Sequence, residues 1–346
     1  MQNDWKVQVS NENNIIKYQN LEYHIEQMLG TGASAKVYKS KKFINSIEQK
    51  EEVALRIQNR YYKQNYEQWN QLKDFKWKNT TYPIENIPGS FLYTEFELFD
   101  GNLTSLGSQD LKTNIFKIAQ TIAYALSEIH KSNFIHYDVK PDNIVFKKIK
   151  DQEFKFALCD FSSIQTLEKA KSEELFIEAT PQFAPPEIQI QGISKDTDES
   201  SDIWSLGMTL YNLYSQHFMF TQDNLDQKQD QNFIDNIVEK DIQDNQQLKQ
   251  LILLLLRVEK KDRIKAYEII EFIQDPNKLK HKFAQIQPKQ TSQNSCQCLY
   301  STQIKKEKVK QPNLEKIPKL LDFINNENLN LRKKISHLLE IPNIVF

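Results

Sequence analysis

The spacing of apolar residues changes once along this chain, near residue 100. Before that point, β-rich segments predict strands at 21–29, after Val37, at 52–57 and at 91–98, and residues 62–75, without Gly or Pro, predict a helix. Beyond Leu103, five apolar residues recur every three or four positions and predict a helix packed on a core: Ile115, Ile118, Ile122, Leu126 and Ile129. The chain is therefore expected to be α+β, with a small β-rich part followed by a larger α-helical part.

Composition excludes several classes of protein. The chain has 45 Lys and Arg residues and 46 Asp and Glu residues, a net charge of −1. This balance does not favour electrostatic binding to nucleic acid or to a membrane surface. Three cysteines are too few for a disulfide scaffold and favour a reducing compartment. The polar start of the chain argues against a signal peptide, and the longest apolar run, residues 251–256, is far shorter than the roughly 20 residues of a membrane span. We expect a cytoplasmic protein with neither nucleic-acid nor membrane partners.

The two ends of the chain differ in amino-acid composition from its centre. Residues 1–20 are polar and rich in Asn and Gln, and we expect a flexible arm there. Residues 284–316 form a polar stretch rich in Lys and Gln, which predicts a linker. Residues 317–346 carry an apolar stripe that begins near Pro318 and predict an amphipathic C-terminal helix. This helix either folds back on its own domain or docks on another protein as a helix in a groove.

The most specific pattern is a set of five short motifs that occur in a fixed order. Residues 136–143 read H-x-D-x-K-P-x-N, and Asp160-Phe161-Ser162 follows. Then come residues 180–187 (TPQFAPPE), residues 202–207 (D-x-W-S-x-G) and finally Arg263. In this order they resemble the H-R-D, D-F-G, A-P-E and D-x-W-S-x-G motifs of the eukaryotic protein kinase superfamily, Ser/Thr type. The resemblance covers roughly residues 21–283.

The resemblance implies a two-lobed fold, with an N-lobe over about 21–97 and a C-lobe over about 103–283. It also implies transfer of a phosphoryl group from ATP, with Mg²⁺, to a protein hydroxyl. Asp138 matches the carboxylate that accepts the hydroxyl proton, and Asn143 and Asp160 match the metal ligands. Lys140 matches the lysine that faces the γ-phosphate in Ser/Thr kinases, and Thr180 matches the threonine that orients base and substrate.

Three further motif residues are expected to support the site without taking part in the chemistry. The resemblance implies that Asp202 steadies the loop that carries Asp138. It also implies that Glu187 and Arg263 form an ion pair that stabilises the C-lobe.

The nucleotide pocket is expected in the N-lobe. Gly30 and Gly32 begin a stretch that resembles the kinase glycine-rich loop, although Ala35 stands in place of its third glycine. The loop leads into strand-like residues rather than a helix, which disfavours a Rossmann site. The resemblance implies further nucleotide contacts. The apolar residues Val37, Ala54 and Val145 would lie around the adenine. Phe96 would be the gatekeeper, and Glu97 and Leu98 would form the hinge, whose position in the sequence is located to within one or two residues.

Four positions depart from the kinase pattern. Arg56 replaces the lysine of V-A-I-K, and a planar guanidinium is not interchangeable with a compact ammonium. Its helix partner, normally a glutamate, falls on Gln68 by spacing from Leu72, with Glu67 as the neighbouring alternative. The other two departures are Tyr137, in place of the H-R-D arginine that pairs with a phosphate on the activation segment, and Ser162, in place of the D-F-G glycine.

These departures leave three functional hypotheses open. The first is a protein that binds Mg·ATP, whose γ-phosphoryl transfer to protein hydroxyls is weak or lost, and which acts on partners as a scaffold or regulator. The second is an active Ser/Thr kinase in which Arg56 steers the phosphates. The third is a structural component that does not need nucleotide.

Overall fold

The computed structural model describes residues 8–10, 14–31, 35–59, 72, 75–81, 83–88, 91–172, 175–177, 179–188, 193–194 and 197–282. These residues belong to the first of two units into which the chain divides, residues 1–288. The predicted linker (284–316) and C-terminal helix (317–346) lie outside the described residues, as do Gly32, Glu67 and Gln68. Of the helix predicted at 62–75, the described residues include Leu72, which is helical, and Phe75, which is not.

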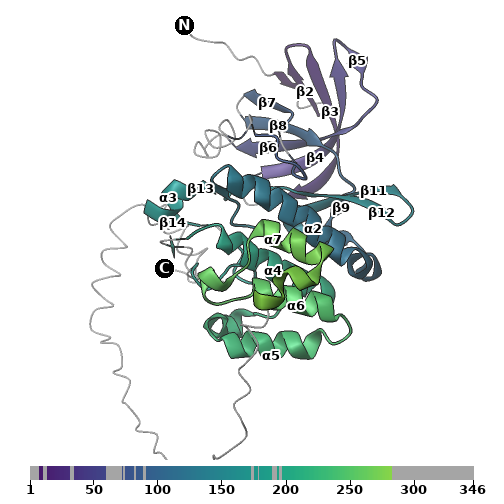
Figure 1. The fold of residues 1–346 in the computed structure, drawn as a ribbon. Helices are drawn as coiled ribbons and strands as arrows, with labels where there is room; N and C mark the ends of the chain where they lie inside the picture. Colours follow the sequence, from purple (N-terminus) through teal and green to yellow (C-terminus); the bar gives the residue numbers. More distant parts are fainter. Residues whose placement is uncertain are drawn as a thin grey trace, which may run out of the picture. The chain divides into compact units, whose positions relative to one another are not determined.

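An eight-stranded sheet forms the N-terminal part of the described structure, and it contains most of the strands at the top of Figure 1. Its strands follow the order β1-β2-β3-β4-β6-β8-β7, with β5 paired to β4, and every pairing is antiparallel. The strands are β1 (Gln8–Ser10), β2 (Ile15–Tyr18), β3 (Leu21–Thr31), β4 (Ala35–Ile44), β5 (Ile47–Glu48), β6 (Val53–Asn59), β7 (Glu85–Pro88) and β8 (Phe91–Glu97). The predicted strands at 21–29, after Val37, at 52–57 and at 91–98 are therefore confirmed.

Alternation along β6 divides its side chains between two environments. Val53 and Leu55 belong to a small apolar cluster with Ile16, Tyr23 and Tyr93. Side chains of neighbouring strand residues point to opposite faces, so Ala54, Arg56 and Gln58 lie on the other face. Ala54 belongs to the main core, which continues into the helical part.

The first strands correct the prediction of a flexible arm over residues 1–20. Residues 15–18 form β2, which pairs with the start of β3, and β1 pairs with β2 in turn. Ile16 is buried against Tyr23 and Leu55. The polar composition of the flanking residues concealed this strand, because one buried isoleucine and backbone pairing with β1 and β3 suffice to hold these four residues in the sheet.

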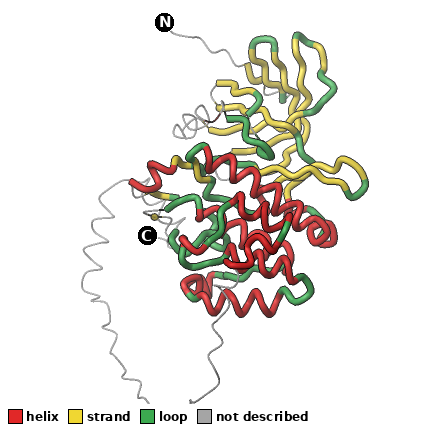
Figure 2. The backbone as a smooth tube through the Cα atoms, in the orientation of Figure 1, coloured by secondary structure: helices red, strands yellow, loops and turns green. Residues whose placement is uncertain are grey.

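The C-terminal part is helical, and Figure 2 separates its red helices from the yellow strands of the sheet. The predicted stripe lies on α2 (Ser108–Lys131), where all five apolar residues are buried. Side-chain caps begin two other helices: Asp230 accepts the amides of Asn232 and Phe233, and Asn245 accepts that of Leu248. The remaining helices are α3 (Leu167–Ser172), α4 (Ser200–Ser215), α5 (Gln231–Asp241), α6 (Gln246–Leu255) and α7 (Ala266–Gln274).

Short strands and 3₁₀ helices make up the rest of the described structure. A three-stranded sheet is formed by β9 (Gly101–Asn102), β11 (Ile144–Lys150) and β12 (Glu153–Leu158), and β10 (Phe134–Ile135) pairs with β13 (Gln165–Thr166). A further pair joins β14 (Leu175–Phe176) to β15 (Ile193–Ser194). The 3₁₀ helices are η1 (Leu103–Ser105), η2 (Pro141–Asn143), η3 (Gln222–Gln229), η4 (Lys260–Asp262) and η5 (Pro276–Leu279).

The arrangement confirms the expected α+β class, a β-sheet lobe followed by a helical lobe. None of the helices in the described part of the chain has the length and apolar character that crossing a bilayer requires.

Candidate active site

Four predicted site residues meet around the carboxylate of Asp138. The Thr180 hydroxyl donates to Asp138 Oδ1 at 3.0 Å, and Lys140 Nζ lies 2.8 Å from Oδ2. Lys140 also donates to the Thr180 hydroxyl at 2.7 Å, which closes a triangle. The Asn143 amide donates to Oδ2 at 2.7 Å and to the Asp138 carbonyl at 2.8 Å. The network fixes the orientation of the carboxylate from three sides, and residues 42 positions apart in the sequence complete it.

The loop that carries Asp138 is held by a buried carboxylate on α4. Asp202 accepts the backbone amides of His136 and Tyr137 at 2.9 and 2.8 Å, and its Oδ2 lies 2.8 Å from the His130 ring. Burial raises the pKa of Asp202, but the interactions with His130 and His136 together outweigh it and leave that pKa below its ordinary value. The predicted supporting role of Asp202 is confirmed.

Two residues of the site adopt left-handed backbone conformations, Tyr137 with φ of 67° and Asp160 with φ of 59°. Such conformations cost free energy for residues other than glycine and persist where surrounding bonds enforce them. At Tyr137 the enforcing bond is the one from its amide to Asp202. Ser162 is not among the described residues with positive φ, so the Cβ that replaces the D-F-G glycine adds no backbone strain in this conformation.

A backbone hydrogen bond places Asp160 next to the network around Asp138. The amide of Cys159 donates to the carbonyl of Asn143 at 2.8 Å. This bond places the two predicted metal ligands at adjoining ends of the paired strands, Asn143 just before β11 and Asp160 just after β12. The Ser162 amide donates to Asp160 Oδ1 at 3.2 Å. Phe161 is buried, with its ring 5.2 Å from that of His136 and 5.8 Å from that of Trp77.

Asn143 and Asp160 offer oxygen ligands suited to Mg²⁺. Both donors of the Asn143 amide group point at Asp138, which leaves its Oδ1 as the remaining acceptor. No group of three acidic, His or Cys side chains in the described residues could hold a cation without other ligands. This pair therefore fits a cation that keeps waters and takes its other ligands from phosphates, which is the usual behaviour of Mg²⁺.

Arg56 lies in β6 opposite Val37 and Thr94, and only 8% of its surface is exposed. Its guanidinium donates to the side-chain oxygen of Gln58, two residues along the same strand. Burial lowers the pKa of Arg56, and the negative charge of Asp160 opposes that shift. Arg56 is thus near enough to Asp160 for the two charges to interact.

The Arg56 partner Gln58 was not anticipated from the sequence. It is 1% exposed, and its Nε2 lacks a hydrogen-bond partner in the part of the chain that the structure describes. Strand alternation was the available signal, because residues 56 and 58 share a face of β6.

The predicted adenine contacts separate into two groups. Ala54 and Phe96 are buried opposite each other in β6 and β8, and Val37 and Leu98 pack against the same core. Val145 is half-buried in β11, opposite Ala157 and Asn102. The Glu97 carboxylate instead accepts a hydrogen bond from Lys155 at 2.8 Å. Only the backbone of Glu97 is therefore available to bind the adenine edge as a hinge.

Gly30 lies in β3 opposite Val37, and a Cβ added to it would meet open space. The structure therefore leaves room beside Gly30, at the start of the predicted glycine-rich loop.

Tyr137, the residue in place of the H-R-D arginine, is buried in an apolar cluster that joins the loop carrying Asp138 to the segment after Asp160. The cluster comprises Ile135, Tyr137, Ala170, Ile177, Ala184 and Ile188. The Tyr137 hydroxyl is hydrogen-bonded to the Thr197 hydroxyl. Apolar packing therefore occupies the position where the resemblance places an arginine and a phosphate.

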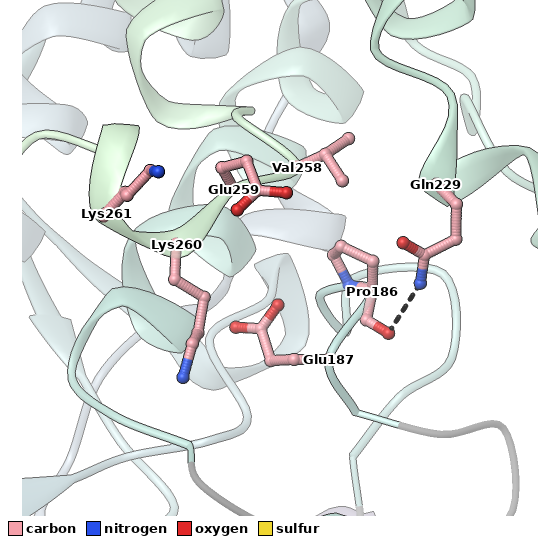
Figure 3. Close-up of a pocket in the computed structure, with 7 residues that line it drawn as sticks. All are labelled: Pro186, Glu187, Gln229, Val258, Glu259, Lys260 and Lys261. Atoms are coloured by element: carbon pink, nitrogen blue, oxygen red, sulfur yellow. Dashed lines mark hydrogen bonds between the residues drawn. The ribbon is translucent and has the colours of Figure 1, made fainter.

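The predicted ion pair between Glu187 and Arg263 is confirmed. Two parallel bonds of 2.7 and 2.8 Å join them, and Arg263 also donates to the carbonyls of Arg257, Val258 and Ser200. Glu187 also lines an open pocket of about 300 Å³ (Figure 3), and Asp138 is not among its lining residues. Its lining residues are Pro186, Glu187, Gln229, Val258, Glu259, Lys260 and Lys261.

Comparison with known proteins gives one family match and several relatives. The protein kinase domain family matches residues 23–273. The meiosis-specific serine/threonine-protein kinase mek1 of Schizosaccharomyces pombe is 34% identical over 135 residues, which is 37% of this chain and 30% of that protein. A probable dual specificity protein kinase YAK1 homolog of Encephalitozoon cuniculi is 30% identical over 236 residues, 62% of this chain and 53% of the relative. The chain thus spans about a third to a half of the length of these relatives.

Proposed function

This chain belongs to the protein kinase domain family, and we propose that it binds Mg·ATP and transfers the γ-phosphate slowly to Ser and Thr hydroxyls. The observation that carries the proposal is the closed network of Asp138, Lys140, Asn143 and Thr180. A carboxylate held by three donors is oriented before a substrate arrives, and preorganisation is the main contribution a protein makes to phosphoryl transfer.

In this proposal Asp138 accepts the proton of the attacking hydroxyl. Its Oδ1 accepts one bond from Thr180, and its Oδ2 accepts from Lys140 and Asn143. Because a carboxylate has about four lone-pair positions, capacity remains for the substrate hydroxyl. The Lys140 ammonium lies beside both Asp138 and Thr180, where it would also attract a phosphate oxygen.

Mg·ATP supplies the transferable phosphoryl group and the charge that neutralises its oxygens. Asn143 Oδ1 and the Asp160 carboxylate would hold the cation, and Val37, Ala54, Phe96 and Leu98 would line the adenine site. Their shared burial on one core supports this assignment.

Slow transfer is proposed because of the way in which Arg56 is held. Its guanidinium is bonded to a neutral glutamine on its own strand and is buried. A guanidinium fixed in this way is less free than a lysine ammonium to follow phosphate oxygens toward the transition state. Its charge remains near Asp160, which supports retained nucleotide binding.

A second candidate is a scaffold that binds nucleotide but transfers no phosphate. The same Arg56–Gln58 bond favours it if this bond keeps Arg56 from placing the phosphates for transfer at all. In that case, segment 317–346 would dock on a partner protein, and the apolar periodicity of its sequence supports this role. A cytoplasmic setting belongs to either candidate and is supported by the low cysteine content.

The test is transfer of labelled γ-phosphate from Mg·ATP to three peptides that differ only in a Ser, Thr or Tyr acceptor. We expect slow labelling of the Ser and Thr peptides and none of the Tyr peptide. Binding of Mg·ATP without labelling of any peptide, or of the protein itself, would replace the proposal by the scaffold. Absence of binding would leave only a structural role.

A further inference from the structure

One lysine in the helical lobe is almost completely buried although nothing in the proposed chemistry uses it. Lys228, in the last turn of η3, is 7% exposed. Its ammonium donates to the carbonyls of Pro181 and Ala184, to the latter at 2.6 Å, and lies 5.6 Å from the centre of the Phe220 ring. The neighbouring Gln229 donates to the carbonyl of Pro186 at 3.1 Å (Figure 3). Both residues thus bind one short segment, residues 180–187.

The 180–187 segment needs donors from elsewhere because of its own composition. Three of its eight residues are proline, which has no amide hydrogen, so a regular backbone ladder is impossible there. The Thr180 carbonyl is satisfied within the segment by the amides of Phe183 and Ala184, each at 3.0 Å. Those of Pro181, Ala184 and Pro186 are satisfied by Lys228 and Gln229.

These bonds connect Lys228 to the base through a short chain of contacts. Lys228 holds the carbonyl of Ala184, and the amide of the same residue donates to the Thr180 carbonyl. Thr180 in turn donates its hydroxyl to Asp138. Release of Ala184 would therefore loosen the turn that places the Thr180 hydroxyl.

A merely structural role accounts poorly for a lysine at this position. Burial lowers the pKa of Lys228 to about 8, although the negative charge of Glu187 raises it. Glu187 is itself paired with Arg263, and Asp223 and Asp226 on η3 are exposed. With the folded-state pKa below its ordinary value of 10.5, the buried cation costs stability in full below pH 8, and this cost falls as the pH rises from 8 towards 10.5.

We propose that Lys228 is a positioning residue, which holds the 180–187 segment so that Thr180 stays bonded to Asp138 and a peptide substrate meets a fixed surface. The inference rests on the proposed function for its kinetic consequences, but not for its structural ones. Lys228 contacts neither the base nor the predicted nucleotide site, so its loss should raise the KM for peptide, lower kcat through the loosened Thr180 and leave the KM for ATP unchanged.

The test uses the full chain with Lys228→Met, which keeps the length of the side chain and removes its donors. Lys240→Met is the matched control, because Lys240 is exposed on α5. Lys228→Arg restores charge and donors and should rescue in part. Amide hydrogen exchange at Phe183 and Ala184 is measured first, since it requires no catalysis. We expect faster exchange at these two amides in Lys228→Met alone, by about tenfold or more, the effect of losing a hydrogen bond to a charged group.

The kinetic arm then measures transfer to a Ser peptide across pH 6.5–9.5, a range that brackets the lowered pKa of Lys228. In the wild-type chain the KM for peptide should stay constant below pH 8 and rise above it, as the ammonium loses its proton. In Lys228→Met the KM for peptide should be high across the whole pH range, with no further rise above pH 8.

Unchanged exchange at Phe183 and Ala184 in a folded Lys228→Met would overturn the inference. Faster exchange without phosphate transfer by any variant would support the positioning role and reject the proposed function instead. If Lys228→Met does not fold, the same exchange measurement is made on Lys228→Gln, whose shorter side chain cannot span to both carbonyls, and unchanged exchange at Phe183 and Ala184 there overturns the inference.

Discussion

Arg56 is the single residue that most limits the proposed activity. It has the charge of the lysine it replaces, but Gln58 holds its guanidinium within β6. We expect Arg56→Lys to raise kcat/KM for ATP by about tenfold, which corresponds to ~1.4 kcal/mol of transition-state stabilisation. Steady-state kinetics of both proteins would measure the gain, with equal melting temperatures as the control for folding. No gain in a folded variant would move the cause of slow transfer away from Arg56.

Tyr137 is the residue where apolar packing replaces a charged contact. Its ring is 1% exposed, and its hydroxyl bonds to Thr197. We expect Tyr137→Phe to lower the free energy of unfolding by about 1 kcal/mol, because the ring stays packed while one buried hydrogen bond is lost. Urea unfolding measures this value, with the exposed Tyr267→Phe as control. A loss as small as that of the control would show that the Thr197 bond contributes nothing.

Residue identities in the catalytic loop could be anticipated from the sequence, whereas some of their partners could not. The motif order placed Asp138, Asn143 and Thr180 as candidates, and the structure brings them together. Gln58 and Lys228 gave no comparable signal. The burial of Lys228 depends on contacts between η3 and residues 44 to 47 positions earlier, and η3 itself is a polar stretch.

At the scale of helices and strands, the packing of α4 on α6 depends on Gly207. A Cβ at this position would lie 2.8 Å from side-chain atoms of Leu255 and Leu256. We expect Gly207→Ala to destabilise the protein by about 1–2 kcal/mol, because overpacking outweighs the gain in helix propensity. Denaturant unfolding measures the effect. Gly107→Ala is the control, since a Cβ there meets open space, and equal stability of the two variants would contradict close packing at Gly207.

Elements with a strong local pattern could be predicted, and those held by pairing alone could not. The stripe on α2 is local and repeats over four turns, so its helix followed from spacing. By contrast, β2 has four residues, of which only Ile16 is buried, and its strand character comes from pairing with β3. The roles assigned to Gly32 and to residues 317–346 stay predictions, because these residues lie outside the described part of the chain.

At the scale of the whole molecule, nucleotide binding should stabilise the folded state. A ligand that binds only the folded protein adds about 2.7 kcal/mol of stability when its concentration is 100 times its Kd. For a domain of this size, that shift raises the Tm by about 5–10 °C. Thermal melting across a series of Mg·ATP concentrations measures the shift, and Asp160→Asn should weaken its dependence on Mg²⁺. An unchanged Tm at saturating Mg·ATP would exclude both nucleotide-dependent functions.

The most direct test of the account is a single-turnover measurement of γ-phosphate transfer with excess protein over Mg·ATP. The proteins compared are the wild-type chain, Asp138→Asn and the control Asp142→Asn, whose side chain is exposed in the same loop. We expect slow transfer by the wild-type chain and by Asp142→Asn, and at least about a hundredfold loss in Asp138→Asn, the usual contribution of a positioned base. Equal transfer by the wild-type chain and Asp138→Asn would contradict the account, because the Asp138 network would then perform no chemistry.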